Sequence, residues 1–163
     1  HAAGLRTIAP DLLGYGESSD AHHMSAPHPQ GLGAQMAMRA ALDDAGLAPD
    51  VIDYINLHGT ATPANDAAEA LAVSAVFGRP VACSSTKGAT GHALGAAGAI
   101  EAVISALALE RGLVPGSAGT QTVDAQLLSG YRLYPEAAAL RHVLSNSFGF
   151  GGSNCALVLG RPS

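Results

Sequence analysis

A chain of 163 residues with 48% hydrophobic residues has the length of one domain and enough apolar side chains to bury a core. The net charge is −5, the eight Lys and Arg residues are scattered and Trp is absent, which argues against a nucleic-acid groove. No apolar run reaches the roughly 18 residues of a membrane span, and no signal core follows the amino terminus, so we expect a cytoplasmic protein that binds no membrane. Only 13% of the residues are charged, and we therefore expect another surface to cover much of this chain.

The first half of the chain predicts alternating strands and helices. It begins at His1 without an initiator Met, as a fragment or a processed chain would. A strand is predicted over residues 12–16, a polar loop with three His and two Pro over 20–30, and a helix over 33–45 that stops at a glycine. Residues 51–57 alternate as a strand does, and Asn65 or Asp66 is expected to cap a helix that runs to about residue 77.

The second half predicts one unusual helix and three more strands. A short strand at residues 81–83 leads into a polar run that ends at Lys87. Residues 95–110 form an Ala-rich helix with apolar residues on nearly every face, which must be buried all round and which one sheet cannot cover. Strands at 142–147 and 154–159 are joined by a glycine-rich turn at 148–153. This order predicts an α/β fold with a mixed sheet and a buried central helix.

Polar residues gather at the ends of the predicted strands and in the turns. The four clusters lie at residues 20–28, 58–66, 87–92 and 148–154, and α/β folds place their chemistry at the carboxyl ends of strands. If the clusters converge, the site holds two imidazoles, one ammonium, several hydroxyls and a flexible turn, without the dense carboxylates of a metal cage. That set of groups suits the stabilisation of a carbonyl oxyanion.

Three of these clusters carry motifs that resemble the β-ketoacyl synthase family. Residues 58–62 read His-Gly-Thr-Ala-Thr and resemble the family's His-Gly-Thr-x-Thr motif. Residues 87–98 resemble its Lys-x-x-x-Gly-His-x-x-Gly-Ala-Ala-Gly motif, and residues 146–154 resemble its third signature. Residues 18–24 also resemble the segment that opens the second half of these enzymes, so the resemblance covers nearly all of the chain after residue 10. The resemblance implies a thiolase-like fold, with residues 1–163 as the carboxyl-terminal half and a mixed sheet of five strands.

The resemblance also implies a role for each motif residue. In the family a cysteine holds the acyl chain as a thioester, while a malonyl thioester loses carbon dioxide and its enolate attacks the acyl carbonyl. His58 and His92 would donate N–H bonds to the malonyl carbonyl as neutral imidazoles, and Lys87 would organise the electrostatics of the site. For His92 we expect the amino terminus of the following helix and Lys87 to disfavour protonation. The other implied roles are hydrogen bonds to the phosphopantetheine arm from Thr60 and Thr62, a substrate-side position for Phe148, a gate at Phe150, and outer positions for Asp66 and for Glu69, with Glu69 paired to Lys87.

Several departures and alternatives stay open. The family's nucleophilic cysteine motif lies in the other half and is absent here, and Cys83 and Cys155 are interpreted as ordinary thiols rather than activated ones. The His-rich loop at 20–28 lacks a known metal-ligand spacing, so neither a metal nor another cofactor is expected. The expected partners are acyl carrier protein, the missing half, and a second synthase or homologue in a dimer. The alternatives are a silent chain-length-factor subunit and a ketosynthase domain of a polyketide or aryl-polyene system.

Overall fold

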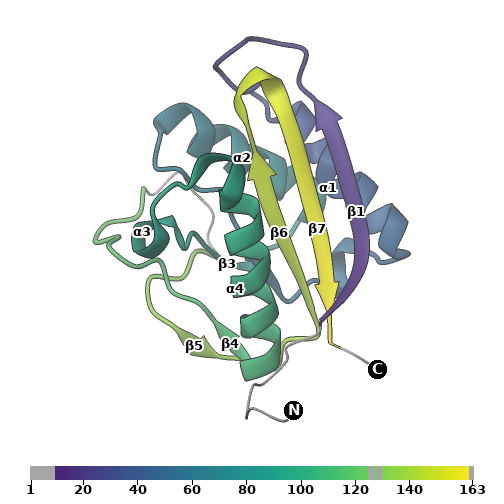
Figure 1. The fold of residues 1–163 in the computed structure, drawn as a ribbon, viewed down its shortest axis with the longest axis vertical. Helices are drawn as coiled ribbons and strands as arrows, with labels where there is room; N and C mark the ends of the chain where they lie inside the picture. Colours follow the sequence, from purple (N-terminus) through teal and green to yellow (C-terminus); the bar gives the residue numbers. More distant parts are fainter. Residues whose placement is uncertain (1–9, 125–126, 128–129, 162–163) are drawn as a thin grey trace.

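Five strands form one mixed sheet in the computed structural model, which describes residues 10–124, 127 and 130–161 (Figure 1). The predicted domain covers residues 1–163, of which residues 1–9, 125–126, 128–129 and 162–163 lie outside the described residues. The sheet has the order β1-β7-β6-β2-β3. The strands β2, β3 and β6 run parallel to one another, while β7 is antiparallel to both β6 and β1. The bounds of these strands are Asp11–Ser19 for β1, Tyr54–Asn56 for β2, Ala82–Ser84 for β3, His142–Phe148 for β6 and Ser153–Gly160 for β7.

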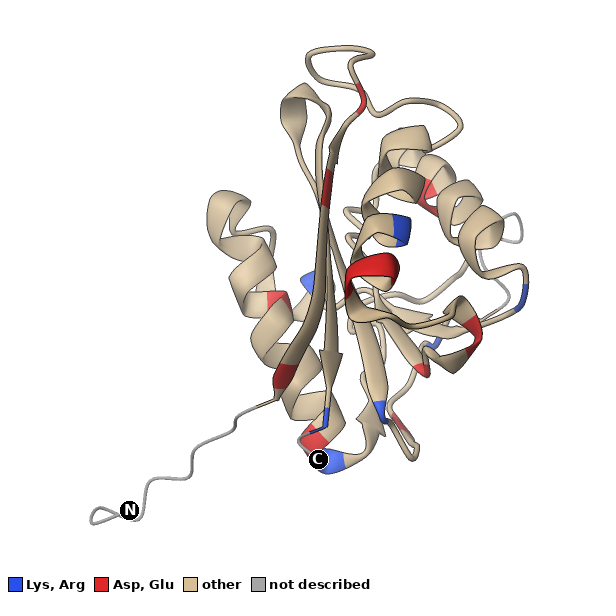
Figure 2. Ribbon diagram, turned by 90° about the vertical axis from the view of Figure 1, so that its right-hand side faces the viewer, with Lys and Arg blue, Asp and Glu red and all other residues tan. Residues whose placement is uncertain are grey.

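Helices cover both faces of this sheet. The helices α1 (Leu32–Ala45) and α2 (Pro63–Phe77) pack on one face, and α4 (Ala97–Arg111) packs on the other. Figure 2 shows the sheet edge-on, with one helix on one side of it and two on the other. The strands alternate accordingly: Ile55 and Leu144 enter the core under α1 and α2, and Tyr54 and Val143 enter the core under α4.

The helix α1 lies unusually close to the edge strand β1. A Cβ atom built at Gly16 would stand 2.1 Å from the carbonyl oxygen of Ala37. No side chain other than hydrogen fits at such a separation, so Gly16 allows the helix backbone to rest directly on the strand.

Short elements link the larger ones. A 3-10 turn at Pro49–Val51 precedes β2, a single helical turn α3 (Lys87–Thr90) follows β3, and a 3-10 turn at Leu94–Ala96 leads into α4. The strands β4 (Leu113–Val114) and β5 (Glu136–Ala137) form a separate antiparallel pair, and a third 3-10 turn, η3, spans Phe150–Gly152.

The structure corrects three predicted boundaries. The strand predicted over 51–57 is only β2, because Pro49 starts a 3-10 turn in front of it. The helix predicted to be capped by Asn65 or Asp66 starts at Pro63 with Thr62 in the cap position, since proline fits the first helical position, where the missing N–H bond is not needed. The helix predicted to begin at residue 95 begins as α4 at Ala97, after a 3-10 turn.

The sheet covers one side of α4, and the other side is open. Val103 on this helix is 59% exposed, whereas Glu101 and Ser105 on its inner side are buried. The expectation that one sheet cannot cover this helix is therefore confirmed, and complete burial would require a further layer. Within the described residues, no helix has the length and apolar character needed to cross a membrane.

Candidate active site

Three of the predicted polar clusters meet because they follow parallel strands. His58 lies just beyond the end of β2, Lys87 lies just beyond the end of β3, and Phe148 ends β6. The carboxyl ends of parallel strands lie at the same edge of a sheet, so the loops that follow them are neighbours. His92 joins them from the loop between α3 and α4.

The two imidazole rings stand edge to face. The centroids of the His58 and His92 rings are 5.5 Å apart, and the ring of Phe148 lies 5.7 Å from that of His58. The ammonium of Lys87 lies 3.4 Å from Nδ1 of His58, and the amide N–H of Leu94 donates to Nδ1 of His92 at 3.2 Å. An ammonium and an amide N–H can only donate, so both Nδ1 atoms act as acceptors and the ring N–H of each imidazole is on Nε2.

His58 is held neutral by its surroundings. Burial, reinforced by the charge of Lys87 and by the neighbouring His92, lowers the pKa of His58 to about 3. A neutral ring with its proton on Nε2 donates a hydrogen bond without bringing a positive charge. The ring of His92 is exposed and a 3-10 turn separates it from α4, so the effect of the helix terminus on this ring stays a prediction.

Lys87 pairs with Glu101. The family resemblance implied Glu69 as its partner, and this prediction is wrong. The Lys87 ammonium forms a short salt bridge with the carboxylate of Glu101, and both side chains are buried. Burial raises the pKa of Glu101, and the hydrogen bond from Lys87 opposes that rise. Glu101 sits on the inner side of α4, so the pair ties this helix to the turn that carries the lysine. The carboxylate in the middle of this Ala-rich helix marks a buried charge, but it does not identify Lys87 as the partner.

Glu69 instead holds the backbone around His58. Its carboxylate accepts the amide N–H groups of His58 at 2.9 Å and of Gly59 at 2.8 Å, and also the side-chain amide of Asn146 at 3.1 Å. Burial raises the pKa of Glu69, and these three donors oppose the rise. Burial likewise raises the pKa of Asp66, which lies one turn earlier on α2. Glu69 therefore contacts the backbone that carries His58, and the outer role of both carboxylates stays a prediction.

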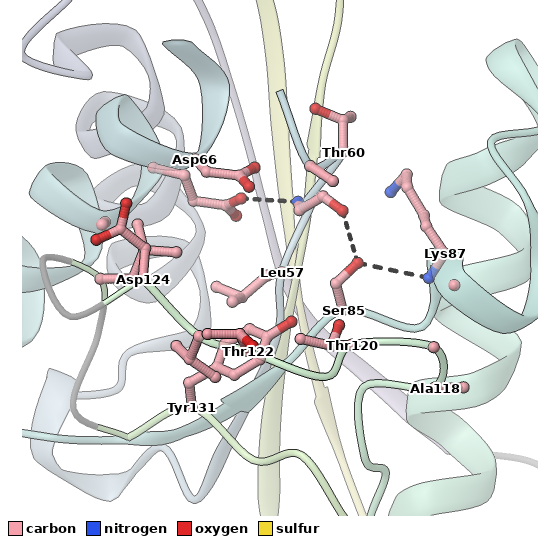
Figure 3. Close-up of a pocket in the computed structure, with 18 of the residues that line it drawn as sticks. Leu57, Thr60, Asp66, Ser85, Lys87, Ala118, Thr120, Thr122, Asp124 and Tyr131 are labelled. Carbon is pink, nitrogen blue, oxygen red and sulfur yellow. Dashed lines mark hydrogen bonds between the residues drawn. The ribbon is translucent and has the colours of Figure 1, made fainter. Parts of the chain in front are cut away.

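The predicted site residues line two adjoining cavities. One, of about 770 Å³, contains His58, His92, Thr60, Thr62, Phe148 and Phe150. The other, of about 600 Å³, contains Lys87, Asp66 and Glu69, and Thr60 and His92 line it as well (Figure 3). The hydroxyl oxygens of Thr60 and Thr62 are 3.0 Å apart. Thr60 and His92 line both cavities, so the two cavities adjoin at these residues.

The loop after β1 is bonded to the glycine turn. Asp20 donates its amide N–H to the carbonyl of Gly152, Gly151 donates to the carbonyl of Met24, and both bonds measure 2.8 Å. The side-chain amide of Asn154 donates to the Asp20 carboxylate at 2.9 Å. Gly151 and Gly152 have positive φ values of 77° and 76°, which glycine adopts without strain. The sequence showed both clusters, but their contact depends on the antiparallel pairing of β1 with β7.

Neither described cysteine has the surroundings of a nucleophile. Cys83 is fully buried in β3, and burial raises its pKa to about 12. Burial also raises the pKa of Cys155. Both thiols are therefore protonated at neutral pH, in agreement with their interpretation as ordinary thiols. Among the described residues, no three His, Cys, Asp or Glu side chains are grouped so that they could hold a metal ion.

The mixed sheet with helices on both faces has the thiolase-like fold of ketosynthases. A chain in the structure of a ketosynthase with its chain length factor from Xenorhabdus doucetiae matches 96% of this chain and 40% of its own length, with a TM-score of 0.89 and 47% identity. A chain in the structure of a polyketide-synthase acyl carrier protein with its hexaketide-bound ketosynthase matches 94% of this chain and 39% of its own length, with a TM-score of 0.88 and 30% identity.

Sequence comparison gives the family. The model of the β-ketoacyl synthase C-terminal domain matches residues 11–121. The mitochondrial 3-oxoacyl-[acyl-carrier-protein] synthase of Arabidopsis thaliana is 46% identical over 160 residues, which cover 93% of this chain and 34% of the relative. The chain belongs to the β-ketoacyl synthase C-terminal domain family, and it spans about a third of the length of this relative.

Proposed function

We propose that this chain forms the malonyl-binding half of a β-ketoacyl-[acyl carrier protein] synthase, which catalyses decarboxylative Claisen condensation. The observation that carries the proposal is the pair of Nε2–H donors that His58 and His92 present on one cavity. Two fixed donors of this kind stabilise a negative charge that develops on a thioester carbonyl oxygen.

The reaction divides between this chain and the rest of the enzyme. When the malonyl thioester loses carbon dioxide, the electron pair of the broken C–C bond moves onto the carbonyl oxygen, which accepts hydrogen bonds from His58 and His92. The enolate carbon then attacks the acyl thioester on the nucleophilic cysteine, a C–C bond forms and the cysteine thiolate leaves. Cys83 and Cys155 are protonated thiols, so we assign the nucleophile to the amino-terminal half of the enzyme.

Lys87 and Glu101 prepare the imidazoles without binding the substrate. The ammonium keeps His58 neutral and its Nδ1 occupied, and the carboxylate of Glu101 keeps the ammonium in place. Removal of the positive charge of Lys87 would let His58 take up a proton more easily. A protonated His58 would bring a positive charge beside the malonyl carboxylate and thioester, where the proposal requires a neutral donor.

The partners follow from the same proposal. The hydroxyls of Thr60 and Thr62 border the cavity of the imidazoles and suit hydrogen bonds to the phosphopantetheine arm of an acyl carrier protein. Phe150 is 79% exposed at the edge of this cavity, a position that suits a gate. We further propose a cytoplasmic dimer, with an identical subunit or with a chain length factor, that uses no cofactor beyond the carrier's arm.

A chain-length-factor role is the competing proposal, because the ketosynthase structure with 47% identity includes such a partner. The intact His58, Lys87 and His92 favour the synthase, since a silent subunit has no use for two imidazole N–H donors on one cavity. The test uses the complete polypeptide with acyl and malonyl carrier thioesters. We expect a covalent acyl-enzyme and a 3-oxoacyl product by mass spectrometry, whereas a polypeptide that forms neither would support the silent subunit.

A further inference from the structure

Ser85 stands between the two loops that carry His58 and Lys87. It follows directly after β3, and its side chain is 8% exposed. Its hydroxyl donates to the carbonyl of Gly59 at 2.7 Å, and the same oxygen accepts the amide N–H of Lys87 at 3.4 Å. Figure 3 shows both bonds meeting at this one oxygen.

We infer that Ser85 is a positioning residue that fixes the loop of His58 against the turn of Lys87. The inference rests on the proposed function, because it assigns to Ser85 the alignment of groups used in decarboxylation. Ser85 lines the cavity of Lys87 and is absent from the lining of the cavity that holds both imidazoles, so it acts through its neighbours.

The peptide of Gly59 is held from both sides. Glu69 accepts its N–H at 2.8 Å and Ser85 donates to its carbonyl at 2.7 Å. His58 is also bonded through its own N–H to Glu69, so three hydrogen bonds hold the backbone of His58 and Gly59. Ser85 supplies the only one of these three bonds that leads to the lysine turn.

Position 85 suits a small residue with a hydroxyl group. Gly59 has a positive φ of 40°, and a Cβ built on it would stand 2.5 Å from the Cβ of Ser85. The two loops therefore touch at van der Waals distance. A hydroxyl can donate to one loop and accept from the other with a single atom, which an alanine of the same size cannot do.

Ser85 is itself fixed by a third segment. Its amide N–H donates to the hydroxyl of Ser117 at 3.3 Å, and Ser117 is buried. The next residues of that segment press against the lysine turn, where a Cβ on Gly88 would stand 1.7 Å from the carbonyl oxygen of Ala118. The orientation of Ser85 is thus determined before any substrate binds, and the 3.4 Å separation between Lys87 and Nδ1 of His58 depends on it.

Ser85→Ala in the complete enzyme tests this inference, with Ser84→Ala as the matched control. Ser84 is the preceding residue and is also buried, but its hydroxyl bonds to that of Tyr54 at 2.8 Å. Ser85→Ala removes two hydrogen bonds, one of them long at 3.4 Å, and Ser84→Ala removes one, so Ser85→Ala should lose somewhat more thermal stability. A displacement of about 1 Å in a catalytic group costs on the order of 100-fold in rate. We therefore expect Ser85→Ala to slow malonyl decarboxylation roughly 10- to 100-fold, with acyl transfer to the nucleophile nearly unchanged.

Hydrogen exchange gives a readout that does not depend on activity. In Ser85→Ala, amide exchange should rise together in peptides covering residues 56–62 and 85–91, and Ser84→Ala should raise neither. If Ser85→Ala does not fold, Ser85→Cys keeps the shape with a weaker donor and should show smaller changes of the same sign. If the wild-type enzyme does not decarboxylate malonyl thioesters, the proposed function fails while exchange still tests the positioning. Equal decarboxylation and equal exchange in the Ser85 and Ser84 variants would overturn the inference.

Discussion

The imidazole of His58 receives its properties from two neighbours and from burial. Lys87 occupies its Nδ1, Glu69 fixes its backbone, and exclusion of water keeps the ring neutral. The chemistry of the site therefore depends on residues that never touch the substrate.

The low pKa of His58 makes stability depend on pH. An unfolded histidine has a pKa near 6.5 and that of folded His58 is about 3, so below about pH 6.5 the unfolded chain binds the extra proton. We expect His58 to reduce the free energy of unfolding by up to about 1.4 kcal/mol for each pH unit between 6.5 and about 3. The raised pKa values of Glu69 and Glu101 have the opposite effect, because the folded state then binds more protons than the unfolded state. Urea unfolding of wild type is therefore compared with that of His58→Gln, in which only the contribution of His58 is removed. Identical pH profiles for the two proteins would contradict a neutral buried His58.

The Lys87–Glu101 pair predicts an asymmetric response to mutation. Glu101→Ala leaves a buried ammonium without its partner, and the free energy of unfolding should fall by about 3–5 kcal/mol. The double variant Lys87→Met with Glu101→Leu replaces both charges by apolar groups and should lose less. Denaturant titration of the two variants measures the difference. A double variant less stable than Glu101→Ala would show that the pair stabilises the fold by a larger amount than burial of charge costs.

At the scale of residues, the sequence singled out polar groups that the structure brings together, but it misassigned one contact. His58 and Lys87 each follow a predicted strand, so their approach could be expected, whereas His92 joins them from the loop between α3 and α4. The partner of Lys87 could not be predicted from the sequence, because it depends on which side of α4 faces the sheet. That helix has apolar residues on nearly all sides, and its pattern does not distinguish the side of Glu101 from the side of Val103.

At the scale of elements, the glycine turn η3 is held by the loop after β1. The bonds of Asp20 and Met24 to the backbone of this turn fix its position, while Phe150 extends from it into solvent. The sequence predicted the turn and the loop as separate polar segments. Their contact follows from the register of β1 on β7, which pairs Ser19 with Ser153 and is not encoded locally.

Phe150→Ala should change acyl loading more than malonyl chemistry. Phe150 is exposed at the edge of the cavity, so its removal should alter stability by less than about 0.5 kcal/mol while changing which acyl chains enter. Rates of acyl-enzyme formation with short and long acyl carriers measure this, with Tyr134→Ala as a control because Tyr134 is 80% exposed and lines neither of the two site cavities. Unchanged loading rates and chain preference would remove Phe150 from the gate.

At the scale of the whole molecule, the outer side of α4 is not covered by another layer of the described residues. The sheet covers the polar inner side of α4 and leaves Val103 exposed, and large exposed apolar faces mark interaction sites or aggregation hazards. The proposed second half of the enzyme would complete this layer. Low charge content gave the same expectation from the sequence, although it could not say which face was involved.

Association through α4 should be sensitive to charge. The 163-residue chain should bind its separately expressed amino-terminal half, or self-associate without it, and Val103→Glu should weaken this binding at least tenfold. Met36→Glu on α1 is the control, because Met36 is also 59% exposed but lies on the opposite side of the sheet. Sedimentation velocity measures both variants. A stable wild-type monomer at micromolar concentration that does not bind the other half would mean that the fold is self-sufficient.

The central claim is that His58 and His92 together stabilise the enolate oxygen. The most direct test is single-turnover decarboxylation of malonyl carrier thioester by the complete enzyme, measured beside radiolabelled acyl transfer to its cysteine. Loss of one oxyanion donor costs about 100- to 1,000-fold, so His58→Ala and His92→Ala should each lose decarboxylation by that factor and keep most of their acyl transfer. A variant at either position that decarboxylates at the wild-type rate but is no longer acylated would contradict the account.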